Sequence, residues 1–229
     1  MKLFSAIAVQ GVVEQFVPAF EKAHACRLDI TWATAPLLMK RLDAGEHADA
    51  LILNRATIDV LKAANRLVAG SDTALAGSAT AVAVRAGAPH PDISTAEALR
   101  RTLLAARAIS YTDPTAGGAS GIYFAKLIER MGIAREVNAK TRFPPPSGYS
   151  GTFLASGEVD LAVQQVPELQ HVPGVEVVGP LPGDLHMVTL FVAGIPAESR
   201  EPVRARALID LLCDTEAKAA FRARGLDPA

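Results

Sequence analysis

The sequence has no long apolar run and no excess of charge of one sign. No stretch approaches the ~20 consecutive apolar residues that a membrane-spanning helix needs. The 229 residues include 23 basic and 24 acidic side chains. These charges nearly balance, and no run of Lys or Arg occurs, which argues against a nucleic-acid-binding surface. We therefore expect neither a membrane nor a nucleic acid as a partner.

Signatures of metals, disulfides and cofactors are also missing. The two cysteines, Cys26 and Cys213, stand far apart and have no metal-ligand spacing, so we interpret them as small apolar residues of the core. The five histidines include no pair four residues apart that could share a zinc ion. Neither a G-x-x-x-x-G-K-[ST] phosphate loop nor a clean G-x-G-x-x-G occurs. The sequence therefore predicts no metal and no organic cofactor.

The chain begins directly with a segment that reads as a strand. No longer apolar region and no cleavage site precede the first helix, which favours a cytoplasmic protein. A periplasmic location is expected instead if a native signal peptide has been trimmed from this sequence.

Strand and helix patterns alternate along most of the chain. With 50% hydrophobic residues, the chain can bury a sizeable core. Alternation at 27–32 and short, mostly apolar segments elsewhere predict strands at 3–8, 27–32, 49–54, 79–85, 108–111, 160–164, 175–178 and 187–193. Helical spacing predicts helices near 12–23, 36–44, 56–64, 97–104, 122–131, 149–156, 202–213 and 215–224. This alternation indicates an α/β fold with a parallel sheet.

One loop combines a strand, small residues and a helix in an order suited to anions. After the strand at 108–111, Asp113-Pro114 turns the chain, and Gly117, Gly118, Ser120 and Gly121 precede the next helix. Glycine lets a ligand approach the backbone, and the free N–H groups of the first helical turn attract negative charge. An ordinary tight turn from strand to helix is the alternative interpretation.

The order and spacing of several short segments resemble a known family. These segments are Phe4–Ala8, Phe20–His24, Trp32–Leu42, Ala48–Leu53, Asp113–Pro114, Ser120–Tyr123, Ser156–Asp160 and Leu208–Leu212. Over essentially the whole chain they resemble the type II periplasmic-binding-protein fold, in its molybdate-binding-protein-like branch. The resemblance implies a two-lobed α/β fold with two crossover strands and a ligand bound between the lobes. Lobe one is then 1–79 with 190–229, and lobe two is 80–189.

Three positions depart from the molybdate-binding pattern. Ala8 and Ala35 stand where molybdate binders have serines, and Gln165 stands where they have a tyrosine. Each lost hydroxyl removes a hydrogen bond worth about 1 kcal/mol, so tight molybdate binding is not expected. The Gly117–Phe124 loop is more similar to the aconitate-isomerase members of this branch, which bind a tricarboxylate and shift its double bond.

The resemblance leaves three functions open. The first is binding of a small di- or tricarboxylate followed by isomerisation through allylic proton transfer. The second is a non-catalytic solute-binding protein, which would partner an importer permease if a leader had been trimmed. The third is a cytoplasmic sensor or scavenger of small anions. All three imply a small-molecule anion as the partner.

For an isomerase, the acid/base group is not evident from the sequence. Tyr149 and His186 are the candidate catalytic residues, whereas Asp113 reads as a turn former and Glu158 as a solvated carboxylate. Arg55 and Arg142 are candidates for the positive charge that a polyanion needs, although either fits a surface arginine equally well.

The residues expected to contact the ligand follow predicted strands or begin predicted helices. They are Ala8, Val9, Gln10, Thr34, Ala35, Asn54, Arg55, Thr115, Gly117, Gly118, Ala119, Ser120, Gly121, Ser147, Gly148, Tyr149, Ser150, Gln164 and Gln165.

Overall fold

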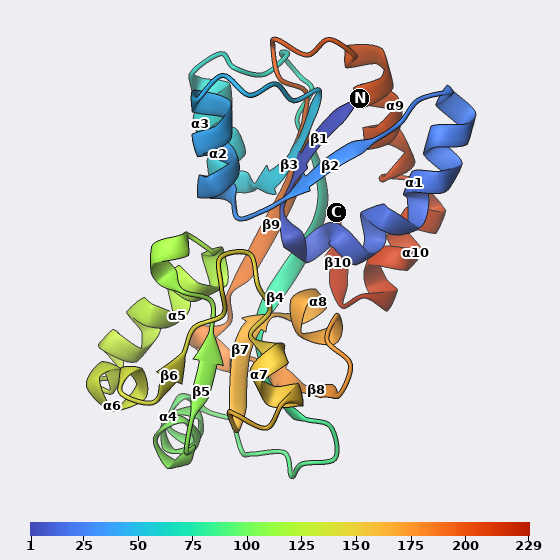
Figure 1. Cartoon of the computed structure of the whole chain (residues 1–229). Coiled ribbons are helices and arrows are strands. Elements are labelled where there is room, and N and C mark those ends of the chain that lie inside the picture. The colour runs from blue at the N-terminus through green and yellow to red at the C-terminus, as the bar shows by residue number, and fades with distance from the viewer. The chain divides into compact units, whose positions relative to one another are not determined.

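The computed structural model describes all residues from Met1 to Ala229 (Figure 1). The chain forms two compact units. Unit 1 comprises Met1–Ser78 with Leu190–Ala229, and unit 2 comprises Ala79–Thr189. The first boundary lies one residue earlier than the sequence suggested. The chain passes between the units within β4 (Thr73–Arg85) and within β9 (Val188–Gly194).

Unit 1 is a sheet with helices on both faces (Figure 1). Its strands are β1 (Lys2–Ser5), β2 (Asp29–Trp32), β3 (Ala50–Asn54), β10 (Leu226–Pro228) and parts of β4 and β9. Its helices are η1 (Ile7–Val9), α1 (Gln10–His24), α2 (Ala35–Asp43), α3 (Arg55–Ala63), α9 (Pro202–Leu211) and α10 (Thr215–Ala223). β1 pairs in parallel with both β2 and β3, whereas β9 runs antiparallel to β3, and β10 runs antiparallel to β4.

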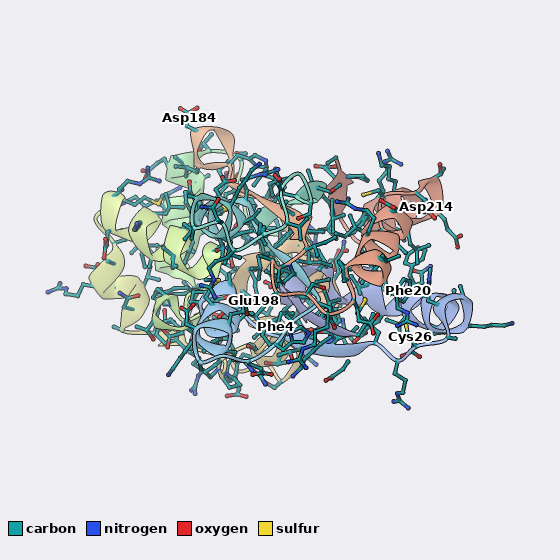
Figure 2. All side chains as sticks on the ribbon, turned by 90° about the horizontal axis from the view of Figure 1, so that it is seen from above. Phe4, Phe20, Cys26, Asp184, Glu198 and Asp214 are labelled. Atoms are coloured by element: carbon teal, nitrogen blue, oxygen red, sulfur yellow. The ribbon has the colours of Figure 1, made fainter.

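Alternation along the strands of unit 1 builds two apolar layers. Leu3 and Ile52 pack toward α1, α9 and α10, in a cluster that also holds Phe20. Phe4 and Leu51 face the other way, toward α2 and α3. The half-buried Cys26 packs against the first of these clusters, where Figure 2 labels it together with Phe20. β1 and β3 are therefore buried on both faces, as expected for a doubly wound sheet, whereas β2 at the edge is only partly buried.

Unit 2 repeats this plan with a different set of elements. Its strands are the second part of β4, β5 (Ile109–Tyr111), β6 (Thr141–Arg142), β7 (Leu161–Gln165), β8 (Val175–Pro180) and the start of β9. Its helices are α4 (Ala96–Ala105), η2 (Pro114–Ala116), α5 (Ala119–Arg130), α6 (Ala134–Asn138), α7 (Gly151–Ala155), α8 (Val166–Gln170) and η3 (Gly183–Leu185). The pairing order is β8–β4–β7–β5–β6, in which β4 runs antiparallel to its neighbours and β7, β5 and β6 run parallel.

The two faces of β4 contribute to apolar clusters of different size in unit 2. Val82 and Val84 belong to the large cluster beneath α4, α5 and α6. Ala81 and Ala83 belong to the smaller cluster beneath the short helices α7 and α8. Alanine on this face brings both short helices close to the sheet, and with them the chain segments at the end of β7.

The alternation predicted from the sequence is confirmed, and the differences lie in short elements. α6, α8, β6 and β10 were not expected, and β4 begins six residues earlier than the predicted strand at 79–85. At the start of α4, Thr95 is the capping residue, because its hydroxyl accepts the Ala98 N–H at 3.1 Å. No helix combines the length and the apolar character needed to cross a bilayer.

Candidate anion-binding rims

The carboxyl ends of the parallel strands form one edge in each unit, and the expected site residues lie on these edges. We define the unit 1 rim as residues 6–10, 33–35 and 54–55, which follow β1, β2 and β3. The unit 2 rim is residues 112–121, 143–150 and 165–168, which follow β5, β6 and β7. Ligands of open α/β sheets bind beyond the carboxyl ends of strands, so the topology favours these rims as binding surfaces.

The unit 1 rim offers mostly backbone donors. Ala8 is 4% exposed and lies just ahead of α1, whereas Ala35 is 7% exposed and begins α2. Neither side chain can donate a hydrogen bond. Thr34 occupies the capping position of α2, but its side chain makes no cap hydrogen bond. The N–H groups of the first turns of α1 and α2 are therefore the main donors of these two segments.

The remaining predicted side chains of the unit 1 rim already have partners. The Asn54 side-chain oxygen accepts the Thr57 N–H and hydroxyl, both at 3.0 Å, and so caps α3. The Arg55 guanidinium lies 3.2 Å from a carboxylate oxygen of Asp72 and 3.7 Å from one of Asp59. Asp72 reaches Arg55 from a distant part of the sequence, and it neutralises much of the charge that Arg55 would offer to an anion.

One cation at this rim was missed by the sequence analysis. A Cβ atom added to Gly11, in the first turn of α1, would lie 2.9 Å from Nη1 of Arg224. Arg224 is exposed and follows α10. Its guanidinium therefore lies beside the positive end of the α1 dipole, an arrangement that an anion would stabilise. Arg224 and α1 are distant in the sequence and meet only in the folded chain. No local sequence pattern therefore predicts that Arg224 lies at this rim.

The glycines of the unit 2 rim let α5 pack against the end of β5. A Cβ atom on Gly118 would lie 2.5 Å from Cγ2 of Thr112, and one on Gly121 would collide with the Thr112 carbonyl oxygen. Gly117 has φ 79°, in the left-handed region that glycine adopts most readily. The glycine-rich segment is therefore first of all a tight junction between strand and helix. That junction leaves the N-terminus of α5 at the rim without a side-chain cap.

Asp113 is occupied as a turn former, as the sequence suggested. Its carboxylate accepts the Thr115 N–H at 2.8 Å and the Thr115 hydroxyl at 2.7 Å. Both donors of Thr115 are thereby engaged locally.

Gln164 ties the second segment of the unit 2 rim to the end of β7. Its side-chain oxygen accepts the Ser150 N–H at 2.7 Å, and its amide nitrogen donates to the Gly148 carbonyl at 3.3 Å. Ser147 has φ 64°, a strained value for a residue other than glycine. The fully buried Gln164 thus holds the 147–150 turn in place.

Three buried polar atoms at this rim have no hydrogen-bond partner. They are the hydroxyls of Thr112, which is 8% exposed, and of Ser150, which is 0% exposed, and the side-chain oxygen of Gln165, which is 3% exposed. The Gln165 amide nitrogen, by contrast, donates to the Thr189 hydroxyl at 2.7 Å. Buried polar groups are nearly always satisfied, so these three atoms set the rim apart from the rest of the unit 2 core.

Glu168, in the first turn of α8, was not among the expected residues. Its carboxylate accepts hydrogen bonds from the Gln165 N–H and the Gln164 side-chain amide, and burial outweighs both and raises the pKa of Glu168 to about 7. Part of the residue nevertheless remains accessible. The run Gln165-Val-Pro-Glu168 has a proline in the first helical turn and a glutamate at its third position. This is a helix-start pattern that could have drawn attention to the residue.

The two candidate catalytic residues lie in different surroundings. The Tyr149 ring stacks on the His171 ring, with centroids 4.7 Å apart. His186 is exposed and ends the η3 turn. From the same turn Asp184 projects away from the body of unit 2, as Figure 2 shows. Arg142 lies 3.7 Å from Glu158, which precedes β7 and so sits at the opposite edge from the rim.

Hollows within the single units lie elsewhere. One of about 590 Å³ in unit 1 is lined by residues such as Glu46, Arg66 and Arg200. Another of about 560 Å³ in unit 2 is lined by residues such as Arg85, Arg107 and Asp160. Neither includes an expected ligand residue. No group of three or more His, Cys, Asp or Glu side chains is arranged to hold a metal ion.

Comparison with known proteins places this geometry in a family. The family model described as bacterial extracellular solute-binding protein matches residues 1–227. The chain belongs to this family. An aconitate isomerase from a Pseudomonas species is 34% identical over 234 residues, which span 100% of this chain and 87% of that protein.

Solved structures agree on the fold. The periplasmic molybdate-binding protein of Azotobacter vinelandii superimposes with a TM-score of 0.79 at 17% identity, covering 99% of this chain and 98% of that one. The sulfate-binding protein of Mycobacterium tuberculosis gives a TM-score of 0.76 at 16% identity, covering 100% and 86%. The predicted type II periplasmic-binding-protein fold is thereby confirmed.

Proposed function

We propose that the protein binds a small organic anion with two or three carboxylates and isomerises it by allylic proton transfer, as an aconitate isomerase would. The observation that carries this proposal is the 34% identity to an aconitate isomerase over the whole chain. The two rims support it, because both present helix N-termini and amide donors suited to carboxylates.

The residues expected from the sequence to contact the ligand stay part of the proposal. In unit 1 we assign binding to the N–H groups around Ala8 and Ala35, with Arg224 added as the source of positive charge. In unit 2 we assign it to the start of α5 and to Ser150 and Gln165, each of which has a buried polar atom without a hydrogen-bond partner in the protein.

The chemistry requires an acid/base group and donors for developing negative charge. Removing a proton from the methylene carbon of aconitate leaves an electron pair shared over three carbons and the adjacent carboxylate. Returning a proton to the former vinylic carbon moves the double bond and allows the cis and trans isomers to interconvert. Fixed N–H donors stabilise the negative charge of this carbanion intermediate. The reaction moves a proton and a double bond and involves no oxidation or reduction.

Purified protein treated with a chelator tests the proposal directly. It should convert trans-aconitate to cis-aconitate and the reverse, reaching one equilibrium ratio from both sides when the isomers are separated by chromatography. Heat-inactivated protein is the control for spontaneous isomerisation. Binding of both isomers without any conversion over hours would reject the isomerase and leave a binding protein.

The family itself favours a second candidate, a non-catalytic solute-binding or sensor protein for a small anion. A thermal-shift screen with molybdate, sulfate, citrate and both aconitates separates the two. Ligand at about a hundredfold excess over its dissociation constant adds about 2.7 kcal/mol of stability. Because Ala8 and Ala35 lack hydroxyls, we expect the carboxylates to stabilise the protein and molybdate not to.

Location remains a prediction. The family description refers to extracellular proteins, whereas the sequence reading favours the cytoplasm. An importer permease would be a partner only of an exported form. Cell fractionation with an antibody against the protein distinguishes the two.

A further inference from the structure

The proposed isomerase needs an acid/base group, and the carboxylates considered from the sequence do not supply one. Asp113 is held by Thr115. Glu158 accepts the Ser156 hydroxyl at 2.8 Å and lies at the edge of unit 2 opposite the rim. A carboxylate suited to proton transfer has to lie on a rim, remain accessible and titrate near neutrality.

Glu168 meets these requirements through its surroundings. It follows β7 directly, and Gln164 links it to the 147–150 turn, since one side-chain amide contacts Gly148, Ser150 and the Glu168 carboxylate. Gln165, whose N–H bonds to the Glu168 carboxylate, and Ser150, whose N–H bonds to Gln164, carry two of the three unpartnered buried atoms of the rim. Glu168 therefore lies in a cluster of unit 2 that has both a titratable group and unused polar atoms.

We propose that Glu168 is the residue that removes the allylic proton of the substrate and returns it. The inference rests on the proposed isomerase function. In the step, the C–H bond of the substrate methylene breaks and its proton forms an O–H bond with the Glu168 carboxylate. The electron pair stays on the substrate as an allylic carbanion. The proton then passes from Glu168, or from water that has exchanged with it, to the other end of the allylic system, which restores the carboxylate.

With a pKa near 7, Glu168 is close to half ionised at neutral pH. It can therefore take a proton from the substrate and give one back at similar free-energy cost. Other titratable groups on the elements around α8 are engaged. His171 stacks on Tyr149, and Glu176 of β8 accepts from His90 at 2.9 Å. Arg85 lies at the far end of β4, away from the rim. Of the titratable groups named here, Glu168 is the one whose carboxylate bonds to the Gln164 side chain.

The alternative role for Glu168 is purely structural. A glutamate at the third position of a helix often accepts the N–H of the capping residue, here Gln165, and thereby stabilises the helix start. A capping role predicts lost stability on substitution and no specific effect on turnover.

The test compares Glu168→Gln, Glu168→Asp and Glu97→Gln with the wild type. Glu97→Gln removes the same charge from the exposed face of α4 and serves as the matched control. Both aconitate isomers are assayed for interconversion between pH 5.5 and 9, and calorimetry gives their dissociation constants. The wild type should gain kcat/KM as the pH rises through about 7, because the ionised form is the base.

Glu168→Gln should lose about a hundredfold or more in kcat, the usual contribution of a positioned acid/base, while its dissociation constant for trans-aconitate stays within about threefold of the wild type. Glu168→Asp should keep a small activity with the same pH dependence, and Glu97→Gln should match the wild type. A Glu168→Gln protein that keeps more than a tenth of wild-type kcat overturns the assignment, as does a wild-type profile with no rise near neutrality. A wild type that converts neither isomer overturns the isomerase itself. Should Glu168→Gln not fold, the aspartate variant and the wild-type profile still decide.

Discussion

The rims of the two units have the same topology and different chemistry. In unit 1 the chain leaves the strands through Ala8, Ala35 and Asn54, which present backbone N–H groups or a side chain already used as a cap. In unit 2 the corresponding edge carries three unpartnered buried polar atoms and a carboxyl with a raised pKa.

Backbone donors such as those of unit 1 can hold an anion, whereas a reaction also needs side-chain groups such as those of unit 2. Backbone donors at a helix start are satisfied equally well by water or by a ligand, so a rim built from them costs little in the free protein. Buried side-chain groups without partners destabilise the free protein, and a ligand that bonds to them removes this cost. On the proposed function, unit 1 would anchor the anion and unit 2 would carry the reacting groups.

The largest expected difference concerns two helix-starting glycines, one in each unit. Gly121→Ala in unit 2 places a Cβ against the backbone carbonyl of Thr112, which cannot move away. Unfolding free energy should fall by about 2 kcal/mol or more. Gly11→Ala in unit 1 meets only the mobile end of Arg224, and should be neutral or gain up to about 1 kcal/mol from better helix propensity. Urea denaturation of both variants measures this, and equal losses would show that the two helix starts are packed equally tightly.

A second prediction concerns the pH dependence of stability. Burial raises the folded-state pKa of Glu168 to about 7, above the 4.5 of an exposed glutamate, so ionisation destabilises the folded protein. This cost is absent below pH 4.5, grows as the pH rises and is complete above pH 7. Glu168→Gln should therefore be more stable than the wild type at pH 8, by about 1 to 3 kcal/mol, and similar to it at pH 4.5.

Thermal unfolding at the two pH values provides the measurement. A difference of this size raises the melting temperature by a few degrees at pH 8, at about 2–4 °C for each kcal/mol in a protein of this length. If the variant is less stable at both pH values, Glu168 acts as a helix cap and the raised pKa has no role.

A third prediction concerns Ser150. Ser150→Ala removes a hydroxyl that has no partner in the free protein, so stability without ligand should stay the same or rise slightly. Affinity for trans-aconitate should fall about five- to tenfold, the value of one hydrogen bond of about 1 kcal/mol. Ser110→Ala is the control, since its buried hydroxyl in β5 is also unpartnered. Loss of affinity in both variants, or in neither, would remove Ser150 from the site.

The smallest expected change in stability is at Asn54. Aspartate caps a helix as well as asparagine does, so Asn54→Asp should keep the unfolding free energy within about 0.5 kcal/mol. The added negative charge at the unit 1 rim should nevertheless weaken tricarboxylate binding several-fold, measured by calorimetry at low salt. Unchanged affinity would show that the anion does not approach this part of the rim.

Much of the fold was predictable because its signals are local. A short continuous apolar run marks β3 as a buried strand, and helical spacing marks α1 and α5. The missed elements are short: α8 has five residues and β6 has two. Such segments carry too few residues for any periodicity to show, and tertiary packing rather than propensity fixes them.

The site was predictable only in part, for the same reason. Strand ends can be read from the sequence, so the rim positions were found. The partners of those positions were not, because Asp72 reaches Arg55 and Arg224 reaches Gly11 only through the fold. Glu168 was overlooked because its environment, rather than its type, makes it distinctive: Gln164 and Gln165 hold a carboxylate that burial keeps partly protonated.

The central claim is that this chain moves a double bond by allylic proton transfer, and the position of a carbon label tests it most directly. Trans-aconitate carrying ¹³C in the carboxylate on the vinylic CH carbon is incubated with wild-type protein and stopped at low conversion. If the account is right, carbon NMR of the cis-aconitate formed will show the label in the carboxylate attached to the methylene carbon, because the double bond has moved to the other side of the central carbon. Label that remains on the vinylic side would mean rotation about the original double bond without proton transfer, and would contradict both the mechanism and the role of Glu168.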